Sequence, residues 1–252
     1  MPSPHIELIP LKSAACSDAP VTLDLLVRIT PPVPDVHFLR PPLNLALVLD
    51  HSGSMAAGKK MAHAREAAAF VVQQLLPTDR LSVTIFDDAV ETIVPNAPVA
   101  DKAGILRRIE GIQPDGSTAL FAGWKEGGAQ ARRHRLADGV NRVLLLSDGL
   151  ANVGPTDPGA ICVEVKALAG WGVGTTTLGV GLDYNEDLME AMARGGDGNY
   201  YFIESARQLA DLFQTELQGL MATVGVKVSL GIEPGHGVRV VEVLNGFDRT
   251  AT

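Results

Sequence analysis

The pattern of apolar and polar residues divides the chain into a central part and two outer parts. Between residues 43 and 223, short apolar runs alternate with segments whose apolar residues recur at helical spacing. The clearest run, LALVL at 45–49, is apolar at every position, which predicts a strand buried on both faces. In the outer parts, at 21–30 and again at 224–232, apolar and polar residues mostly alternate, as in half-buried strands.

The central part predicts a doubly wound, mostly parallel α/β sheet with helices on both faces, because its strands alternate with helices. The expected strands are 45–49, 81–85, a short antiparallel return through Val94, 143–146, 174–180 and 200–203, in the order 3-2-1-4-5-6. The expected helices are 58–76, 101–109, one from the loop at 113–118 to about 135, one starting at Asp157-Pro158, 186–193, and one from Ser205 to near Thr223.

The outer parts predict a second, discontinuous unit. Prolines are frequent between residues 31 and 42, which indicates a stiff connector before the central part. We therefore expect an α/β domain over 43–223 and an antiparallel β-sandwich-like subdomain made from 1–42 and 224–252, with a further strand at 238–244. Such a small unit forms only a marginal core, so either this β layer docks on the α/β domain or the chain is part of something longer.

Composition narrows the possible functions. The formal net charge of −8 argues against a nucleic-acid partner, because phosphate binding normally shows a basic footprint. Two cysteines are too few for a disulfide scaffold or a four-cysteine zinc site. The N-terminus lacks the pattern of a secretory signal, and no apolar stretch is long enough to span a membrane, so we expect a soluble, cytoplasmic protein.

Candidate metal-binding side chains follow the ends of the predicted buried strands. Asp50, Ser52 and Ser54 follow the first strand, Thr118 lies in a later loop, and Asp148 follows the strand at 143–146. Carboxyl ends of parallel strands share one edge of an open α/β sheet, where ligands bind. All five side chains carry hard oxygen atoms, which suit Mg²⁺, Mn²⁺ or Ca²⁺. Each alone has a simpler explanation, since Ser, Thr and Asp also cap helices. His51 is expected to be a solvent-facing spacer and not a ligand.

Two enzyme classes compete for the same loop. Residues 53–59, GSMAAGK, match most of a phosphate-binding loop, but Lys60 stands where a Ser or Thr should meet Mg²⁺. A phosphatase with Asp50 as nucleophile would need a second Asp at position 52, where Ser52 stands. Neither class is favoured.

The order Asp-x-Ser-x-Ser, distant Thr, distant Asp resembles the metal-ion-dependent adhesion site (MIDAS) of the von Willebrand factor A domain family. Asp50, Ser52, Ser54, Thr118 and Asp148 fill its five places in order, and the resemblance covers about residues 43–222. It implies that the three hydroxyls hold a divalent cation, which Asp50 and Asp148 reach directly or through water. It also implies an open coordination position that accepts an Asp or Glu carboxylate of a partner protein.

We therefore expect a non-enzymatic, metal-dependent protein-binding or assembly module. A β layer beside the A domain resembles bacterial intracellular members of the family and the heavy chains of inter-alpha-trypsin inhibitor. Two alternatives stay open: a nucleotide hydrolase that uses residues 53–59, and a protein that interacts through its β layer and has a purely structural metal site.

Overall fold

Strand β3 (Leu43–Asp50) lies in the interior of a six-stranded sheet. The computed structural model describes residues 4–14, 20–31, 40–149, 153–181, 184–223 and 228–244. All eight residues of β3 are buried. Leu43, Leu45, Leu47 and Leu49 join the hydrophobic core on one face of the sheet, and Ala46 and Val48 join the core on the other. The prediction of a strand buried on both faces is therefore confirmed.

The sheet has the predicted topology. Its order is β5-β4-β3-β6-β7-β8, and the pairs are parallel except for β5, which runs antiparallel to β4. This is the predicted order 3-2-1-4-5-6. The other strands are β4 (Arg80–Phe86), β5 (Val90–Pro98), β6 (Val140–Ser147), β7 (Gly174–Val180) and β8 (Tyr200–Ile203).

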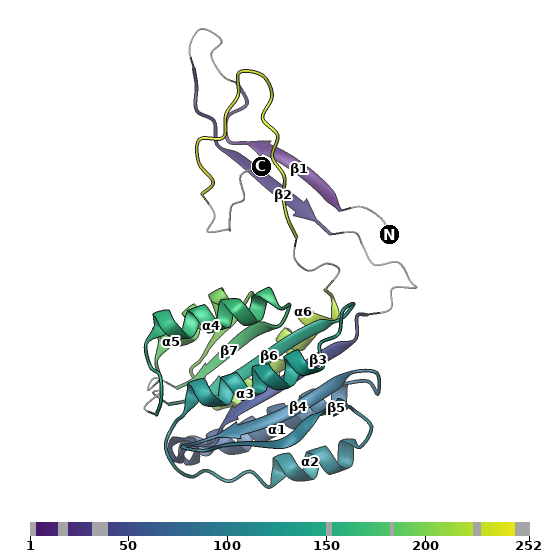
Figure 1. The fold of residues 1–252 in the computed structure, drawn as a ribbon, viewed down its shortest axis with the longest axis vertical. Coiled ribbons are helices and arrows are strands. Elements are labelled where there is room, and N and C mark those ends of the chain that lie inside the picture. Colours follow the sequence, from purple (N-terminus) through teal and green to yellow (C-terminus); the bar gives the residue numbers. More distant parts are fainter. Residues whose placement is uncertain are drawn as a thin grey trace.

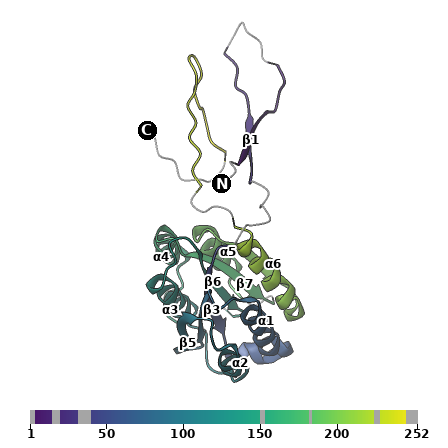
Figure 2. The ribbon, with the colours of Figure 1, turned by 90° about the vertical axis from the view of Figure 1, so that its right-hand side faces the viewer.

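Helices cover both faces of the sheet. Figure 2 shows α1 and α6 on one side and α3 and α4 on the other, and α5 contributes to the same core as α3 and α4. The helices are α1 (Lys60–Gln74), α2 (Lys102–Glu110), α3 (Leu120–Arg133), α4 (Pro158–Gly170), α5 (Glu186–Gly195) and α6 (Leu209–Met221), with 3₁₀ helices η1 (Gly53–Lys59) and η2 (Ala206–Gln208). Asp157 caps α4 by accepting from the backbone N–H of Ala160 at 2.7 Å.

Helix α1 begins later than the sequence pattern predicts. Gly58 and Lys59 both have left-handed backbones, with φ of 59° and 60°. Two left-handed residues interrupt a right-handed helix, so the expected helix start at 58 moves to Lys60. The residues before it, Gly53–Lys59, form η1.

Helix α3 packs closely on the sheet because it carries small residues. Gly127 is buried, and a methyl group added there would overlap Cγ2 of Val48 on β3. The absence of a side chain at Gly127 therefore sets how near the helix axis lies to the central strand.

A buried ion pair fixes where the chain enters the sheet. The Asp79 side chain has no exposed surface and accepts from Nη1 of Arg40 at 3.0 Å and Nη2 of Arg40 at 2.5 Å. The same carboxylate accepts from the backbone N–H of Leu43 at 2.9 Å and of Leu76 at 2.6 Å. One buried carboxylate thus ties the start of β3 to the turn after α1.

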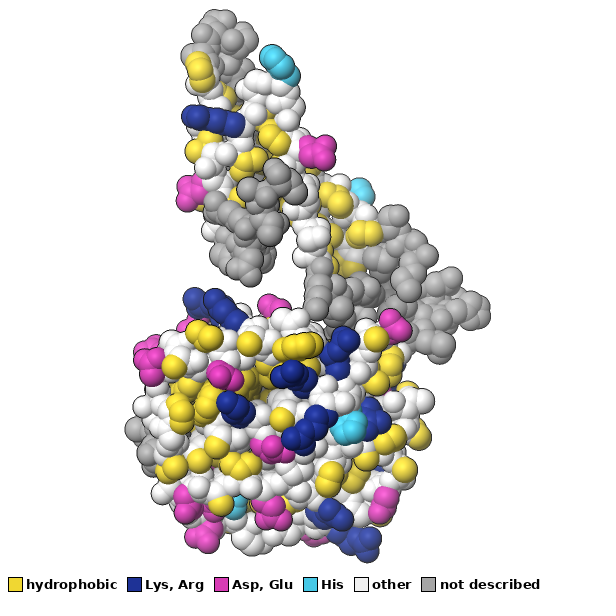
Figure 3. All heavy atoms as spheres, viewed as in Figure 1, with side chains coloured by type: hydrophobic (Ala, Val, Ile, Leu, Met, Phe, Trp, Pro, Cys, Tyr) yellow, Lys and Arg dark blue, Asp and Glu magenta, His cyan; other side chains and the backbone are white. Residues whose placement is uncertain are grey.

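The outer parts stand outside the α/β unit (Figures 1 and 2). Strands β1 (His5–Pro10) and β2 (Leu25–Thr30) form an antiparallel two-stranded sheet, which Arg28 and Glu7 bridge at 3.2 Å. Apolar side chains lie exposed along both outer parts, as the yellow atoms in the upper part of Figure 3 show.

Among the described residues, the β-sandwich-like subdomain predicted from both chain ends is represented by the two-stranded sheet of β1 and β2. Residues 228–244 form no strand and no pair with β1 or β2, although their sequence alternates. A segment in which apolar and polar residues alternate forms a strand only when a partner strand and a covering layer are present. The side chains of Val228, Leu230 and Val240 are exposed here. Residues 224–227 of the predicted strand lie outside the described residues.

Both outer parts join the α/β unit at the edge of the sheet where the parallel strands begin. The first leads into Leu43, the start of β3, and the second follows Met221, the end of α6 (Figure 1). The loops that follow β3 and β6 lie at the opposite edge. Within the described ranges, no helix combines the length and the apolar character that crossing a membrane requires.

Candidate metal centre

Two carboxylates meet at the carboxyl ends of neighbouring strands. Asp50 is the last residue of β3, and Asp148 follows Ser147, the last residue of β6. Because β3 and β6 pair in parallel, their ends lie side by side. Both aspartates are completely buried. The sheet topology thus places two acidic groups at the edge where open α/β folds bind ligands.

The two serines of the Asp-x-Ser-x-Ser motif connect these carboxylates. Oδ1 of Asp50 accepts from the backbone N–H of Ser52 at 2.8 Å. Oγ of Ser52 lies 3.1 Å from Oγ of Ser54, and Oγ of Ser54 donates to Oδ1 of Asp148 at 2.6 Å. Four of the predicted residues therefore form one continuous hydrogen-bonded chain.

Thr118 reaches the same cluster from the loop before α3. Thr118 is only 4% exposed. A methyl group added at Gly149 would lie 2.9 Å from Oγ1 of Thr118 and 3.6 Å from Oγ of Ser54. Thr118 and Ser54 therefore lie together beside the backbone of Gly149, and Ser54 connects Thr118 to the hydrogen-bonded chain of the other three predicted residues.

Backbone hydrogen bonds hold the Thr118 loop against the Asp-x-Ser-x-Ser loop. The N–H of Gly53 donates to the carbonyl of Gly116 at 3.1 Å, and the N–H of Asp115 donates to the carbonyl of His51 at 2.8 Å. Gly116 has a φ of 67°, and a side chain there would overlap the carboxylate of Asp88. Glycine at this position therefore lets the two loops lie together.

Asp50 is an unusual carboxylate. Burial raises its pKa above the ordinary value, and the nearby charge of Asp148 adds to the rise. Hydrogen bonds from Ser147 and Ser52 act in the opposite direction. Ser147 donates to Oδ2 of Asp50 at 2.5 Å. The sequence motif does not include Ser147, although a second polar residue at a buried strand end signals such a role.

Lys60 is the second residue that the motif does not include. Its ammonium lies 2.7 Å from Oδ2 of Asp148, and its side chain is 18% exposed. A methyl group added at Gly181, after β7, would lie 3.5 Å from Nζ of Lys60. The first residue of α1 therefore extends its cation across the strand ends to the metal-binding motif.

This geometry does not favour a phosphate-binding loop. Residues Gly53–Lys59 form 3₁₀ turns, in which Met55 donates its N–H to the carbonyl of Ser52. Backbone N–H groups engaged in such turns are not presented together to a phosphate, as the loop of that class requires. Lys60, which occupies the place of the hydroxyl residue of that motif, binds Asp148 instead.

The prediction that His51 faces solvent is wrong. Its side chain is only 14% exposed, Nδ1 lies 3.0 Å from the carbonyl oxygen of Gln113, and Nε2 lies 3.7 Å from Oδ2 of Asp87. The backbone pairing of His51 with Phe86 and Asp115 turns its ring toward the neighbouring loops. His51 thus helps to position the Thr118 loop.

The donor set fits a hard divalent cation. The five side chains offer carboxylate and hydroxyl oxygens, and no imidazole or thiolate is among them. Over the described part of the chain, no three His, Cys, Asp or Glu side chains gather closely enough to hold a metal. A metal at this edge would therefore depend on the three neutral hydroxyls as well as on the two aspartates.

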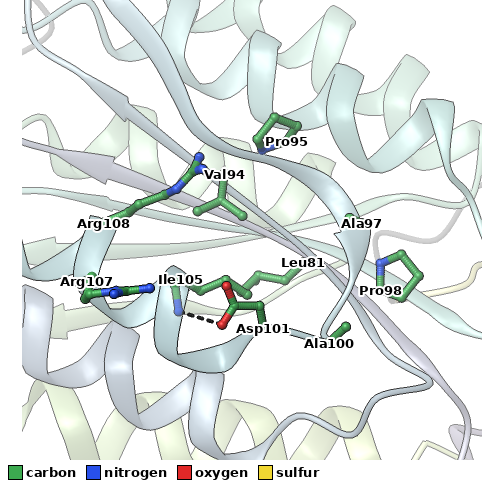
Figure 4. Close-up of a pocket in the computed structure, with 11 residues that line it drawn as sticks. Leu81, Val94, Pro95, Ala97, Pro98, Ala100, Asp101, Ile105, Arg107 and Arg108 are labelled. Carbon is green, nitrogen blue, oxygen red and sulfur yellow. Dashed lines mark hydrogen bonds between the residues drawn. The ribbon is translucent and has the colours of Figure 1, made fainter.

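A cavity lies away from this motif, among the described residues of α2 and β5. It has a volume of about 540 Å³ between α2 and the edge strand β5, and Figure 4 shows Leu81, Val94 and Ile105 lining it. Asp101 lies at its rim and accepts from the backbone N–H of Gly104 at 2.8 Å, which caps α2. Leu81 lies at the start of β4, about 16 Å along the strand from Phe86 at the other edge. This cavity is therefore separate from the metal-binding motif.

Comparisons with known proteins show which family the α/β unit resembles. A model of the von Willebrand factor type A domain matches residues 44–215. The uncharacterized protein sll0103 of Synechocystis is 35% identical over 193 residues, 76% of this chain and 44% of its own. The protein YfbK of Escherichia coli is 31% identical over 77% of this chain and 34% of its own length. Human inter-alpha-trypsin inhibitor heavy chain H4 is 28% identical over 75% of this chain and 22% of its own length. The chain spans less than half the length of these relatives.

Solved structures share the fold. A von Willebrand factor type A protein from Catenulispora acidiphila superposes with a TM-score of 0.66 at 16% identity, over 85% of this chain and 49% of that one. Proximal thread matrix protein 1 from the mussel byssus, in a structure with a zinc-occupied MIDAS motif, gives a TM-score of 0.58 at 18% identity. The match covers 71% of this chain and 47% of that one. The family match and the fold lead to one conclusion: this chain belongs to the von Willebrand factor type A domain family.

Proposed function

We propose that this chain is a non-enzymatic binding module that captures a carboxylate of a partner protein through a divalent cation. Domains of this family are generally interaction modules. The observation that carries the proposal is the hydrogen-bonded chain from Asp50 through Ser52 and Ser54 to Asp148, with Thr118 beside it.

The charge balance of this donor set supports capture of an anion. Ser52, Ser54 and Thr118 are neutral ligands, whereas Asp50 and Asp148 supply at most two negative charges. Hydrogen bonds from Ser147 and the ammonium of Lys60 already engage these two carboxylates. A divalent cation held here supplies an incompletely neutralised Lewis acid that attracts a further carboxylate.

Each residue has a distinct role in the proposal. Ser52, Ser54 and Thr118 hold the cation through their hydroxyl oxygens, and Asp50 and Asp148 reach it directly or through water. Ser147 fixes the orientation of Asp50. Lys60 balances the buried charge of Asp148 when no cation is bound. We assign Mg²⁺, with Mn²⁺ or Ca²⁺ as alternatives, because every donor is a hard oxygen. Zinc occupies the motif in the mussel protein.

Open access to the site also supports the proposal. Ser54 is exposed, so one side of the motif faces solvent. The two outer parts join the α/β unit at the opposite edge of the sheet. A partner can therefore approach the motif without displacing either of them.

Binding of a short labelled peptide tests the proposal. A Gly-Ser peptide that contains one Glu is titrated with the whole chain in Mg²⁺, in Mn²⁺ and in EDTA, next to the same peptide with Gln. We expect binding of the Glu peptide with either metal and loss of binding in EDTA, with the Gln peptide, and in Asp148→Ala. Asp138→Ala, which removes an exposed carboxylate from a turn, is the matched control. Equal binding of the Glu and Gln peptides, or binding that persists in EDTA, would overturn the proposal.

A further inference from the structure

We propose that a second anionic group of the same partner segment binds in a basic pocket beside the metal site, so that the partner is an acidic segment and not a single exposed carboxylate. This inference rests on the proposed function. It adds the residues Lys59, His63 and Arg207, which we call the basic pocket, and a second carboxylate as their ligand.

The pocket lies between the start of α1 and η2. It has a volume of about 340 Å³ and is lined by Gly58, Lys59, His63, Ser205, Ala206 and Arg207. No Asp or Glu is among the lining residues, although the chain carries 29 acidic and 21 basic residues. A hollow lined by basic side chains and by no carboxylate, in an acidic protein, favours an anionic ligand.

The two strongest cations of the pocket are available. Lys59 and Arg207 are exposed, and within the described ranges neither makes an ion pair or a side-chain hydrogen bond. His63 pairs with Glu66, one turn further along α1, at 3.4 Å. An incoming carboxylate would therefore meet two cations that it need not separate from existing partners.

The backbone presents Lys59 in an unusual way. Lys59 has a φ of 60°, a left-handed conformation that residues other than glycine rarely adopt. No side chain caps the first turn of α1, which begins at the next residue. The macrodipole of a helix favours negative charge at its N-terminus, so the start of α1 adds to the positive character that Lys59 gives the pocket.

Chain connectivity places the pocket next to the metal motif. Lys59 adjoins Lys60, whose ammonium lies 2.7 Å from Asp148, and Gly58 belongs to the same η1 that carries Ser54. Helix α1 also packs against η2, which supplies Arg207. An extended peptide of a few residues spans the distance between the two sites, so one carboxylate at the motif leaves a second within reach of the pocket.

The test compares peptides with one and two carboxylates. Gly-Ser peptides with a single Glu, and with two Glu separated by one to four residues, are titrated with the whole chain in Mn²⁺. We expect the best two-Glu peptide to bind at least fivefold more tightly than the single-Glu peptide. The double variant Lys59→Asn, Arg207→Gln should abolish this advantage and leave single-Glu binding unchanged. Asparagine is chosen at position 59 because it tolerates the left-handed backbone.

Controls separate a site from a general effect of charge. Arg107→Gln with Arg133→Gln removes the same charge from exposed positions outside the pocket and should preserve the fivefold advantage. An advantage that survives Lys59→Asn, Arg207→Gln, or that the control variant loses equally, would overturn the basic pocket and leave the metal site standing. If Asp148→Ala or EDTA leaves single-Glu binding intact, the proposed function fails and this inference fails with it.

Discussion

The ammonium of Lys60 lies 2.7 Å from Oδ2 of Asp148, while Ser54 donates to Oδ1 of the same carboxylate at 2.6 Å. One buried aspartate thus receives a cation on one oxygen and a hydroxyl of the metal motif on the other. Because Asp148 is fully buried, its charge requires such partners. Lys60 therefore stabilises Asp148 but also adds a positive charge where a divalent cation would bind.

Lys60→Met should bind Mn²⁺ about tenfold more tightly than the wild type. The substitution keeps a long aliphatic side chain and removes a positive charge that repels the cation at short range, an effect of about 1 kcal/mol or more. Isothermal titration calorimetry gives the affinity directly. The thermal midpoint measured in EDTA should fall, because Asp148 loses its ion pair.

Lys59→Asn is the matched control for this charge effect. It removes one lysine charge from the adjacent residue, which does not contact Asp148, and should change the Mn²⁺ affinity by less than about twofold. Equal affinities of Lys60→Met and the wild type would show that Lys60 does not influence the metal site.

Glu216 binds α6 to the sheet through a buried network. It is 3% exposed and accepts from Oγ1 of Thr176 at 2.6 Å, Nδ2 of Asn199 at 2.8 Å and the hydroxyl of Tyr201 at 2.9 Å. Glu216→Ala should therefore lower the free energy of unfolding by about 3 kcal/mol, because it leaves buried donors unpaired. Glu216→Gln keeps an acceptor and should cost less. Urea unfolding measures both variants, and equal losses would contradict the network.

Tyr201 makes this network sensitive to alkaline pH. Burial, together with the nearby charge and hydrogen bond of Glu216, raises the pKa of Tyr201 to about 12. In the unfolded chain, the hydroxyl of this tyrosine ionises near pH 10. Because the pKa is higher in the folded state than in the unfolded state, the contribution of Tyr201 to the free energy of unfolding is fully present below pH 10. This contribution is lost as the pH rises to 12. The stability difference between the wild type and Tyr201→Phe should therefore shrink over this range in urea unfolding, and a constant difference would contradict the shift.

Gly127→Ala should destabilise the fold by about 1–3 kcal/mol, because the added methyl group overlaps Val48 beneath α3. Gly219 on α6 is the matched control. It is exposed and has open space around it, so Gly219→Ala should stabilise by about 0.5–1 kcal/mol through helix propensity. Thermal unfolding of the two variants should therefore show shifts of opposite sign. Shifts of the same sign would contradict the close packing of α3.

The domain boundary predicted at residue 43 has a direct test. A fragment of residues 40–223 retains the Arg40–Asp79 pair and the whole six-stranded sheet, so it should unfold cooperatively near the temperature of the α/β unit in the full chain. Arg40→Ala in this fragment should lower the midpoint, because the buried Asp79 loses its guanidinium partner. A fragment that aggregates without cooperative unfolding would show that the outer parts are needed for folding.

The sequence predicts those features that depend on local pattern. The continuous apolar run of β3 indicates burial on two faces, and helices between the strands impose a parallel sheet. Parallel strands then bring Asp50 and Asp148 to one edge, so topology alone explains why residues 98 positions apart meet.

The remaining features depend on packing between distant segments. The local sequence pattern does not predict that the side chain of Lys60 points to Asp148. That contact follows from the angle between η1 and α1. Two left-handed residues, Gly58 and Lys59, set that angle, and only Gly58 is a residue type that favours such a backbone. Whether the alternating residues 228–244 form a strand likewise depends on a partner strand, which the described residues do not supply.

Anomalous diffraction from crystals of the chain grown with Mn²⁺ tests the central claim most directly. We predict a single strong peak at the carboxyl edge of the sheet, within about 2.5 Å of the hydroxyl oxygens of Ser52 and Ser54. The peak should disappear in Asp148→Ala. Manganese bound elsewhere, with Ser52, Ser54 and Thr118 still bonded only to protein groups, would contradict the account.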